Sequence, residues 1–360
     1  MAKRNFYVSE NQLDDFQLGI INRKTDSSLL VKGCAGSGKT LLALLKAKRI
    51  TDAGEGSVIF IVLTKALLRF ISDAVQEMNF KESFQCFSYH QWLGRGSPAA
   101  DFVFVDEATD FDAGKIGEFQ NAARRALFLY GDSAQQLYTF DRSRTALSME
   151  ELKAQTDFPL QSLNNNHRLP AKVARLAKYL NTELDLSGES PSALPFTCIH
   201  EGVSLPKVLH LPDFVAQLEF IKSQVENRGL QDVGILLRSN EEVEAAFQYL
   251  AGMGLMAERK FNSTAEQSVM TLDFHSVRPK IMTYHSAKGL QFETVFVLLP
   301  GFYGAGTYLS SEEVKALYVA TTRTYDELFI LHTTPLPPIL GRIPSDLYED
   351  KLSSGSSPRY

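Results

Sequence analysis

The sequence predicts an α/β fold of two lobes, each a parallel sheet flanked by helices. Short apolar runs alternate with amphipathic stretches along the chain, which is typical of strand–helix–strand units. The apolar runs are continuous rather than alternating, as expected of parallel strands covered on both faces. A glycine-rich loop also joins the first run to the first long helical pattern. The 360 residues allow roughly two or three domains.

The order of elements follows from these patterns. The apolar runs predict strands at 28–32, 57–63, 102–105 and 126–130, and then at 208–211, 233–237, 280–283, 294–298 and 327–331. The amphipathic stretches between them have helical spacing. They predict helices at 39–50, 66–78, 171–180, 213–226, 241–251 and 311–322. We therefore expect lobes at 1–165 and 166–345, followed by a loosely held polar tail at 346–360.

Composition excludes several classes of protein. The apolar runs are strand-length, far below the roughly 18 residues of a membrane span, and the N-terminus lacks a signal-type apolar stretch. Cys34, Cys86 and Cys198 are too few and too scattered for a disulfide framework or a zinc site. This usage predicts reduced thiols in a cytoplasmic protein without a membrane partner. A net charge of −5 and a pI of 5.9 exclude a broadly basic nucleic-acid coat but allow a local groove.

Residues 33–40, GCAGSGKT, fit the phosphate-loop pattern GxxxxGKS/T. They follow a predicted strand and open a predicted helix, which is the context that the pattern needs. Backbone N–H groups of such a loop close around phosphate oxygens at the helix N-terminus. Lys39 would reach the terminal phosphates, and the Thr40 hydroxyl would ligate Mg²⁺. The residues expected to hold the nucleotide here are Gly33, Gly36, Ser37, Gly38, Lys39 and Thr40.

An acidic pair ends the predicted strand 102–105. Asp106 at a strand end beside a phosphate loop can hold Mg²⁺, and the adjacent Glu107 can activate an attacking water as general base. The alternative is a solvated acidic strand end. The pair follows the phosphate loop by one α/β unit, which favours the catalytic interpretation. ATP and Mg²⁺ are therefore the expected cofactors, with Thr40 and Asp106 as the metal-holding residues.

Residues 106–110, DEATD, resemble the DEAxD signature of UvrD/Rep-type superfamily 1 helicases. Further segments are similar to motifs of that family, in the family's order: SENQ at 9–12, FSYH at 87–90, GDSAQQLY at 131–138, NHR at 166–168, TYHSAKGLQF at 283–292 and LYVATTR at 317–323. These segments span most of the chain. The resemblance implies two RecA-like P-loop NTPase lobes, with ATP between them and one nucleic-acid strand across both.

The resemblance implies a catalytic role for residues of both lobes. Gln135 would sense the γ-phosphate or its attacking water. Arg168 and Arg323 would act as arginine fingers, because guanidinium groups stabilise the charge that develops in phosphoryl transfer. The whole expected catalytic set is Lys39, Asp106, Glu107, Gln135, Arg168 and Arg323.

Three more residues would bind the nucleotide. Gln12 would pair with the adenine edge through its amide. His167 stands where the family has Tyr, and it would stack on adenine over a smaller area. Gly289 belongs to the THxxKG-like segment and would line the same site.

A nucleic-acid path is implied as well, because aromatic faces stack on any base. Its expected residues are Thr64, Lys65, Phe87, His90, Phe140, His285 and Ser286. Core packing is the alternative for Phe87 and Phe140, and a solvated helix start is the alternative for Lys65.

Length departs from the family pattern. Two inserted subdomains of the UvrD type would lie between His90 and Asp106 and between Arg168 and Thr283, and both segments are too short for them.

The leading hypothesis is an ATP-dependent translocase or helicase on single-stranded DNA, moving 3′→5′ with weak or partner-dependent unwinding. One alternative is an ATPase switch subunit that regulates a partner nuclease or effector in DNA repair or anti-phage defence. Another is an RNA helicase, since stacking and phosphate contacts do not distinguish the two nucleic acids.

Overall fold

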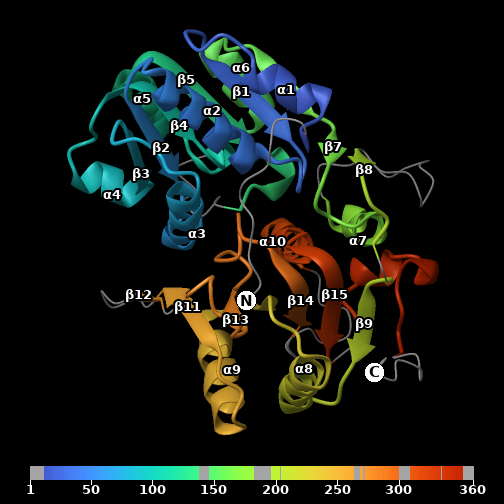
Figure 1. Cartoon of the computed structure of the whole chain (residues 1–360). Coiled ribbons are helices and arrows are strands. Elements are labelled where there is room, and N and C mark those ends of the chain that lie inside the picture. Colours follow the sequence, from blue (N-terminus) through green and yellow to red (C-terminus); the bar gives the residue numbers. More distant parts are fainter. Residues whose placement is uncertain are drawn as a thin grey trace. The chain divides into compact units, whose positions relative to one another are not determined.

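The computed structural model describes residues 12–137, 146–181, 196–202, 204–262, 268–270, 272–299, 309–333 and 335–351 (Figure 1). The chain divides into two compact units, which we call the N-terminal unit (residues 4–167) and the C-terminal unit (residues 168–360). The division falls between His167 and Arg168, two residues beyond the expected lobe boundary. Each unit is a largely parallel sheet with flanking helices, so the predicted α/β class is confirmed.

The N-terminal unit is built on a six-stranded parallel sheet with the order β3-β2-β4-β5-β1-β6. Its strands are β1 (Leu29–Gly33), β2 (Val58–Val62), β3 (Phe84–Ser88), β4 (Ala100–Val105), β5 (Ala123–Gly131) and β6 (Leu160–Leu163). Its helices are α1 (Asp15–Ile21), α2 (Lys39–Ala53), α3 (Lys65–Glu77), α4 (Tyr89–Gly94), α5 (Ala113–Ala122) and α6 (Met149–Thr156). The short β7 (Asn165–Asn166) ends this unit. Because β4, β5 and β1 are neighbours, their carboxyl ends meet at one edge.

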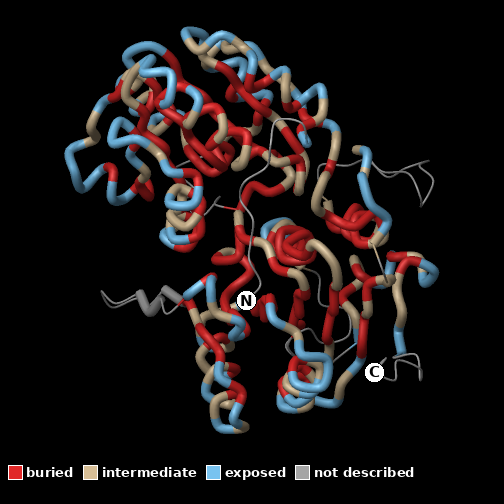
Figure 2. The backbone as a smooth tube through the Cα atoms, in the orientation of Figure 1, coloured by how far each residue is buried: buried red, intermediate tan, exposed pale blue. Residues whose placement is uncertain are grey.

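Apolar side chains cover both faces of this sheet, which explains its continuous apolar strands. On one face, Phe111 and Phe119 belong to the core cluster, with ring centroids 5.1 Å apart. On the other face, Phe104 stacks on Phe128 with centroids 4.6 Å apart. Helix α2 covers this second face, and the Lys46 ammonium lies 5.4 Å from the centre of the Phe128 ring. Figure 2 shows the central strands as buried.

The C-terminal unit contains a seven-stranded sheet with the order β12-β11-β13-β10-β14-β15-β9, in which only the β11–β12 pair is antiparallel. The sheet strands are β9 (Lys207–His210), β10 (Val233–Leu237), β11 (Glu258–Asn262), β12 (Ser268–Met270), β13 (Lys280–Thr283), β14 (Phe292–Leu299) and β15 (Thr324–His332). The unit also has β8 (Thr197–Cys198) and the helices α7 (Ala171–Ala177), α8 (Phe214–Arg228), α9 (Asn240–Gly252) and α10 (Ser311–Thr321). Phe296 and Phe329 stack in its core with centroids 4.7 Å apart.

Two segments bear on the expected organisation. Residues 95–99 link α4 directly to β4, so the N-terminal unit has no room for a subdomain between His90 and Asp106.

The prediction of a loosely held tail from residue 346 is wrong for residues 346–351. Leu347 is buried, and the Glu349 backbone exchanges hydrogen bonds with Pro206 and Val208 beside β9. Residues 352–360 lie outside the described part of the chain.

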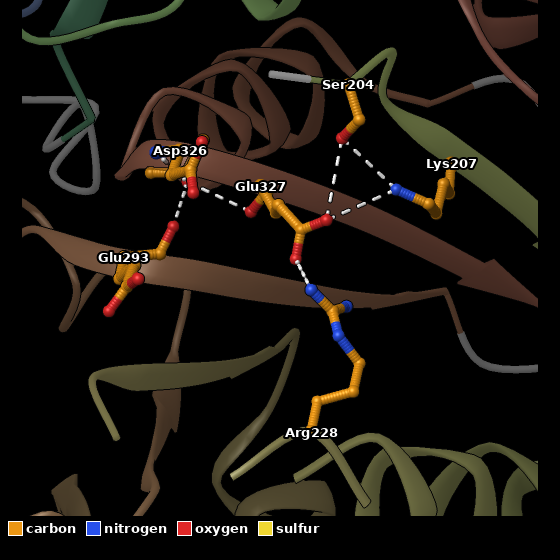
Figure 3. A network of polar contacts seen from close by, with 7 residues as sticks. Ser204, Lys207, Arg228, Glu293, Asp326 and Glu327 are labelled. Atoms are coloured by element: carbon orange, nitrogen blue, oxygen red, sulfur yellow. Dashed lines mark hydrogen bonds and ion pairs between the residues drawn. The ribbon is translucent and has the colours of Figure 1, made fainter. Parts of the chain in front are cut away.

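A polar network lies where β14 and β15 begin (Figure 3). Glu327 accepts from Lys207 at 3.4 Å, and it also pairs with Arg228 of α8. Burial, reinforced by neighbouring acidic groups, raises the pKa of Glu293 and of Asp326 above the ordinary carboxyl value. These charges occupy the amino edge of the sheet, whereas residues 283–290 follow the carboxyl end of β13.

Candidate active site

The phosphate loop requires glycine at the positions that the sequence pattern marks. Gly36 and Gly38 have φ of +81° and +85°, in the left-handed region that side chains disfavour. A Cβ atom on Gly33 would lie 2.4 Å from the Ser37 hydroxyl oxygen and 3.1 Å from Leu163. The loop therefore keeps its shape only because side chains are absent from these three positions.

A cation and a buried hydroxyl occupy the inside of this loop. The Lys39 ammonium donates to the backbone carbonyls of Gly33 at 2.7 Å and Cys34 at 3.1 Å, and the side chain is 7% exposed. The Ser37 hydroxyl is fully buried and has no hydrogen-bond partner among the described residues. A phosphate would supply acceptors to both groups, so the loop fits the ligand that its sequence predicts.

Thr40, Asp106 and Glu107 form the next layer of the site. The Thr40 hydroxyl donates to Asp106 Oδ2 at 2.7 Å, and the Glu107 backbone N–H donates to Asp106 Oδ1 at 3.0 Å. Burial and the neighbouring Glu107 charge raise the pKa of Asp106 to about 6, against the opposing effects of Thr40 and Lys39. Glu107 is 6% exposed and has a φ of +55°. A non-glycine residue in that region carries backbone strain, which is common at functional sites.

These residues fit Mg²⁺, which prefers oxygen ligands and keeps several water or phosphate ligands. Thr40, at the start of α2, and Asp106, just after β4, present oxygens to one point. Among the described residues, no group of three or more His, Cys, Asp or Glu side chains could hold a metal ion. The two side chains would therefore need the nucleotide phosphates as further ligands.

The segment after β5 lies against the segment after β4. The Gln135 side-chain amide donates to Asp132 Oδ2 at 2.6 Å, and the Thr109 hydroxyl donates to the Asp132 backbone carbonyl at 3.3 Å. The Leu137 N–H donates to the Asp110 carboxylate at 3.1 Å. Gln135 is thereby held, buried, at the same sheet edge as Glu107. The DEAxD-like and GDxxQ-like segments form one hydrogen-bonded unit.

The predicted His167 is held beside the loop by a residue that the sequence interpretation missed, Asp14. His167 Nε2 lies 2.9 Å from Asp14 Oδ2, and the His167 backbone N–H donates to the Gly36 carbonyl at 2.9 Å. The spacing of Asp14 and Gln17 is a capping-box signal that could have identified this region. Gln12 is exposed at the start of the described chain.

The two predicted arginines both donate to Thr322 in the C-terminal unit. Arg168 Nη2 donates to the Thr322 carbonyl at 2.9 Å, and Arg323 Nη2 donates to the Thr322 hydroxyl at 3.2 Å. Arg323 is 2% exposed, and it also donates to the carbonyls of Val319 at 2.9 Å and Leu290 at 3.4 Å. The NHR, THxxKG-like and LYVATTR segments therefore converge on Thr322 and Arg323. Gly289, with a φ of +80°, makes the turn that delivers the Leu290 carbonyl.

The predicted nucleic-acid residues of the N-terminal unit separate into two groups. Thr64 caps α3 by accepting from the Leu67 N–H at 3.1 Å, and Lys65 and His90 are exposed. For Phe87, the structure favours the core-packing alternative over a nucleic-acid contact. Phe87 is 6% exposed and belongs to the core cluster. Strand β3 pairs with β2 in a register that points this ring toward the core.

The remaining nucleic-acid candidates lie outside that unit or outside the described residues. Ser286 is buried and accepts from the Thr283 hydroxyl at 3.0 Å, which is a turn-forming contact. His285 is partly exposed, and burial, with the nearby Lys288 charge, lowers its pKa against the effect of Glu312. Phe140 lies outside the described residues.

A phosphate loop followed by a strand-terminal Asp-Glu pair defines a P-loop nucleoside triphosphatase. The comparisons refine this class. Residues 29–220, more than half of the chain, match the model of the viral superfamily 1 RNA helicase core domain. Residues 255–334 match the UvrD-like helicase C-terminal domain. The chain belongs to the superfamily 1 helicases, and the resemblance drawn from its motifs is confirmed.

Individual relatives are distant. A protein of Acanthamoeba polyphaga mimivirus, named as an ATP-dependent DNA helicase, is 24% identical over 295 residues, which cover 75% of this chain and 38% of that protein. The arterivirus nonstructural protein 10 helicase is 16% identical with a TM-score of 0.51, over 91% of this chain and 63% of its own. The C-terminal domain of a Lactobacillus protein described as a possible DNA helicase is 22% identical with a TM-score of 0.37, over 51% of this chain and 97% of its own. Within the described residues, no helix is both long and apolar enough to cross a membrane.

Proposed function

We propose that this protein hydrolyses ATP to drive movement along a single strand of nucleic acid, with DNA as the preferred strand. One observation carries the proposal: the carboxyl ends of β1, β4 and β5 bring the phosphate loop, the acidic pair and Gln135 to one sheet edge. Family membership supports an ATP-driven helicase in general. The chain spans 38% of the mimivirus relative, so activity, strand and direction belong to the proposal.

Each N-terminal residue has a role that its surroundings allow. Lys39, already inside the loop, would exchange its two carbonyl acceptors for phosphate oxygens. Thr40 and Asp106 would hold Mg²⁺, which supplies charge neutralisation on the phosphates. Glu107 would accept the proton of the attacking water while Gln135 orients that water. Arg168 and Arg323 are proposed to stabilise the charge on the transferring phosphoryl group.

The strand identity has a second candidate. The family model that matches residues 29–220 describes RNA helicases, whereas the mimivirus relative is named for DNA. Stacking contacts serve either nucleic acid, and contact to the 2′-hydroxyl is what separates them. RNA is therefore a direct competitor in the test of the proposal.

The test is ATPase activity with single-stranded DNA, single-stranded RNA or duplex, alongside displacement of strands with 3′ or 5′ tails. We expect stimulation by single-stranded DNA above that by RNA, and displacement from 3′ tails that is weak or depends on a partner. Lys39→Ala should reduce hydrolysis at least about 100-fold, because one preorganised donor to a transferring group is worth roughly that much. Absence of stimulation by either strand would contradict a translocase and favour a partner-dependent switch.

Lys48→Ala is the matched control for the lysine substitution. Lys48 lies on the same helix, where it pairs with Asp52 at 2.8 Å on the solvent side. Its removal should leave hydrolysis unchanged. An equal loss in both variants would mean that damage to α2, rather than loss of a phosphate contact, explains the Lys39 result.

A further inference from the structure

Helix α1 reaches the phosphate loop through its own N-terminal cap. Asp14 Oδ1 accepts from the Gln17 backbone N–H at 2.8 Å, and Gln17 Oε1 accepts from the Asp14 N–H at 3.1 Å. The same Gln17 side chain then donates through Nε2 to the Ser37 carbonyl at 3.1 Å, and it is 4% exposed. A capping box that usually satisfies only its own helix here also holds the loop.

The second oxygen of the Asp14 carboxylate serves the other side of the loop. Asp14 Oδ2 accepts from the Asn165 side-chain amide at 2.8 Å and lies 2.9 Å from His167 Nε2. His167 donates its backbone N–H to the Gly36 carbonyl at 2.9 Å. Burial would raise the pKa of Asp14, but the hydrogen bonds from Gln17, Asn165 and His167 outweigh it and lower that pKa below its ordinary value. Asp14 is therefore a carboxylate at neutral pH.

Holding these two carbonyls fixes the direction of two loop N–H groups. In a trans peptide the C=O and the following N–H point in opposite directions. Fixing the Gly36 carbonyl therefore orients the Ser37 N–H, which now donates to the Cys34 carbonyl at 3.2 Å. Fixing the Ser37 carbonyl orients the Gly38 N–H in the same way. Glycines leave these peptides free to rotate otherwise, and a phosphate site needs its N–H groups aimed inward.

We propose that Asp14 is a positioning residue for the phosphate loop. It holds the Ser37 side of the loop through Gln17 of α1, and it holds the Gly36 side through His167. The proposal deepens the proposed function, because the loop is the nucleotide site of that function. It also makes a claim about the loop without any nucleotide. The two claims can therefore fail separately.

Asp14→Asn isolates the proposed role. Asn caps helices about as well as Asp, and its oxygen can still accept from the Gln17 N–H. Its amide group, however, faces the donors Asn165 and His167, so the second half of the cluster is lost. We expect hydrogen–deuterium exchange at residues 36–39 of the nucleotide-free protein to rise about 10-fold, and the ATP dissociation constant to rise by about the same factor, which is the scale of one charge-assisted hydrogen bond.

The double variant Asp14→Asn, Asn165→Asp exchanges the partners and restores the amide–carboxylate bond. It should recover most of the protection at residues 36–39. Asp213→Asn is the matched control, because Asp213 caps α8 in the C-terminal unit by accepting from the Ala216 N–H at 2.8 Å. This control removes a cap charge but keeps a cap oxygen, so it should leave exchange at residues 36–39 and nucleotide binding unchanged.

The outcomes separate cleanly. Unchanged exchange at residues 36–39 in Asp14→Asn overturns the proposal, and so does an increase that spreads equally over α1, because that pattern is loss of a helix cap. No rescue by the exchanged pair also overturns it. If the loop loosens and is rescued while the wild-type protein neither binds nor hydrolyses ATP, the positioning role stands and the proposed function fails.

Discussion

The two units hold their motif residues in opposite ways. In the N-terminal unit, Asp106 and Glu107 are buried side by side, and burial together with the Glu107 charge raises the pKa of Asp106. In the C-terminal unit, Arg323 is equally buried, but backbone carbonyls and the Thr322 hydroxyl receive its donors. Buried charge that is not compensated costs free energy, whereas a buried guanidinium with its donors satisfied contributes to the packing around it.

The difference indicates what each site contributes to folding. The raised pKa of Asp106 indicates that its ionised form costs folding free energy, and the proposed Mg²⁺ would offset that cost. The C-terminal arginines are part of their unit's architecture before any ligand is present. In the N-terminal unit, a substitution should therefore be able to lower turnover without lowering stability. In the C-terminal unit, a substitution at the arginine cluster should lower both.

Glu107→Gln should give the largest effect and the clearest separation. The amide keeps the shape of the side chain but cannot accept a proton. Turnover should fall by about 100- to 10,000-fold, the usual contribution of a general base, while ATP binding and the unfolding temperature are kept or improved. Steady-state hydrolysis, nucleotide titration and thermal unfolding check the three parts.

Glu82→Gln controls for the loss of a negative charge in the same unit. Glu82 is exposed before β3, away from the strand ends of the site. Its substitution should leave hydrolysis unchanged. Near-normal turnover in Glu107→Gln would remove the general-base role and leave Glu107 as a strained strand-terminal residue only.

The fold was predictable wherever burial alone decides the structure. Each predicted strand and helix is present, with ends displaced by a few residues, because continuous apolar runs and long amphipathic stretches leave few alternatives. The missed elements are short or mixed. Strand β3, with the sequence FQCFS, has buried and exposed positions and forms through its parallel pairing with β2. Helices α1 and α4 are too short to show a helical period.

The site was predictable where a motif fixes the chemistry, and it was missed where tertiary contacts decide. The phosphate loop, Asp106 and Gln135 come together as their spacing and the strand order require. Phe87 could not be assigned from the sequence, because an aromatic residue near a motif carries no sign of which way its ring points. Asp14 and Thr322 went unnoticed since their partners are far away in sequence, at residues 165–168.

Thr322→Val tests the other half of the comparison, with a moderate expected effect. The Arg168 bond goes to the Thr322 backbone and survives, whereas the Arg323 bond goes to the hydroxyl and is lost. Hydrolysis should fall about 10-fold with little change in ATP affinity, because a mispositioned guanidinium affects the transition state more than the ground state. The split between kcat and KM is the measurement.

Thr321→Val is a close control for that substitution. The Thr321 hydroxyl is as deeply buried, but it donates to the Tyr318 carbonyl of its own helix at 2.9 Å and to no arginine among the described residues. The two variants should lose similar stability, and only Thr322→Val should lose turnover. Equal turnover in both would assign Thr322 to packing and would weaken the claim that the C-terminal arginines link stability to catalysis.

Asp106→Asn tests stability rather than turnover, and the sign of its effect is the sharpest test of the comparison. The folded-state pKa of about 6 lies above the ordinary value of 3.8, so the folded protein binds this proton more tightly than the unfolded chain. Stability is therefore lost as pH rises from about 4 to about 6 and stays lower above that. The neutral amide should raise the free energy of unfolding at pH 7.5 by at most about 3 kcal/mol, the equivalent of roughly two pKa units.

That gain should vanish near pH 4, where Asp106 itself is protonated, so unfolding temperatures at several pH values measure it. Asp101→Asn, near the start of the strand that Asp106 follows, provides the contrast. Hydrogen bonds from the Ser57 backbone and hydroxyl, both 2.8 Å, lower the pKa of Asp101 despite some burial. Its carboxylate stabilises the fold above its ordinary pKa, so its loss should destabilise the protein at pH 7.5. If both variants shifted stability in the same direction, the N-terminal site would carry no electrostatic cost, and the contrast between the two units would fail.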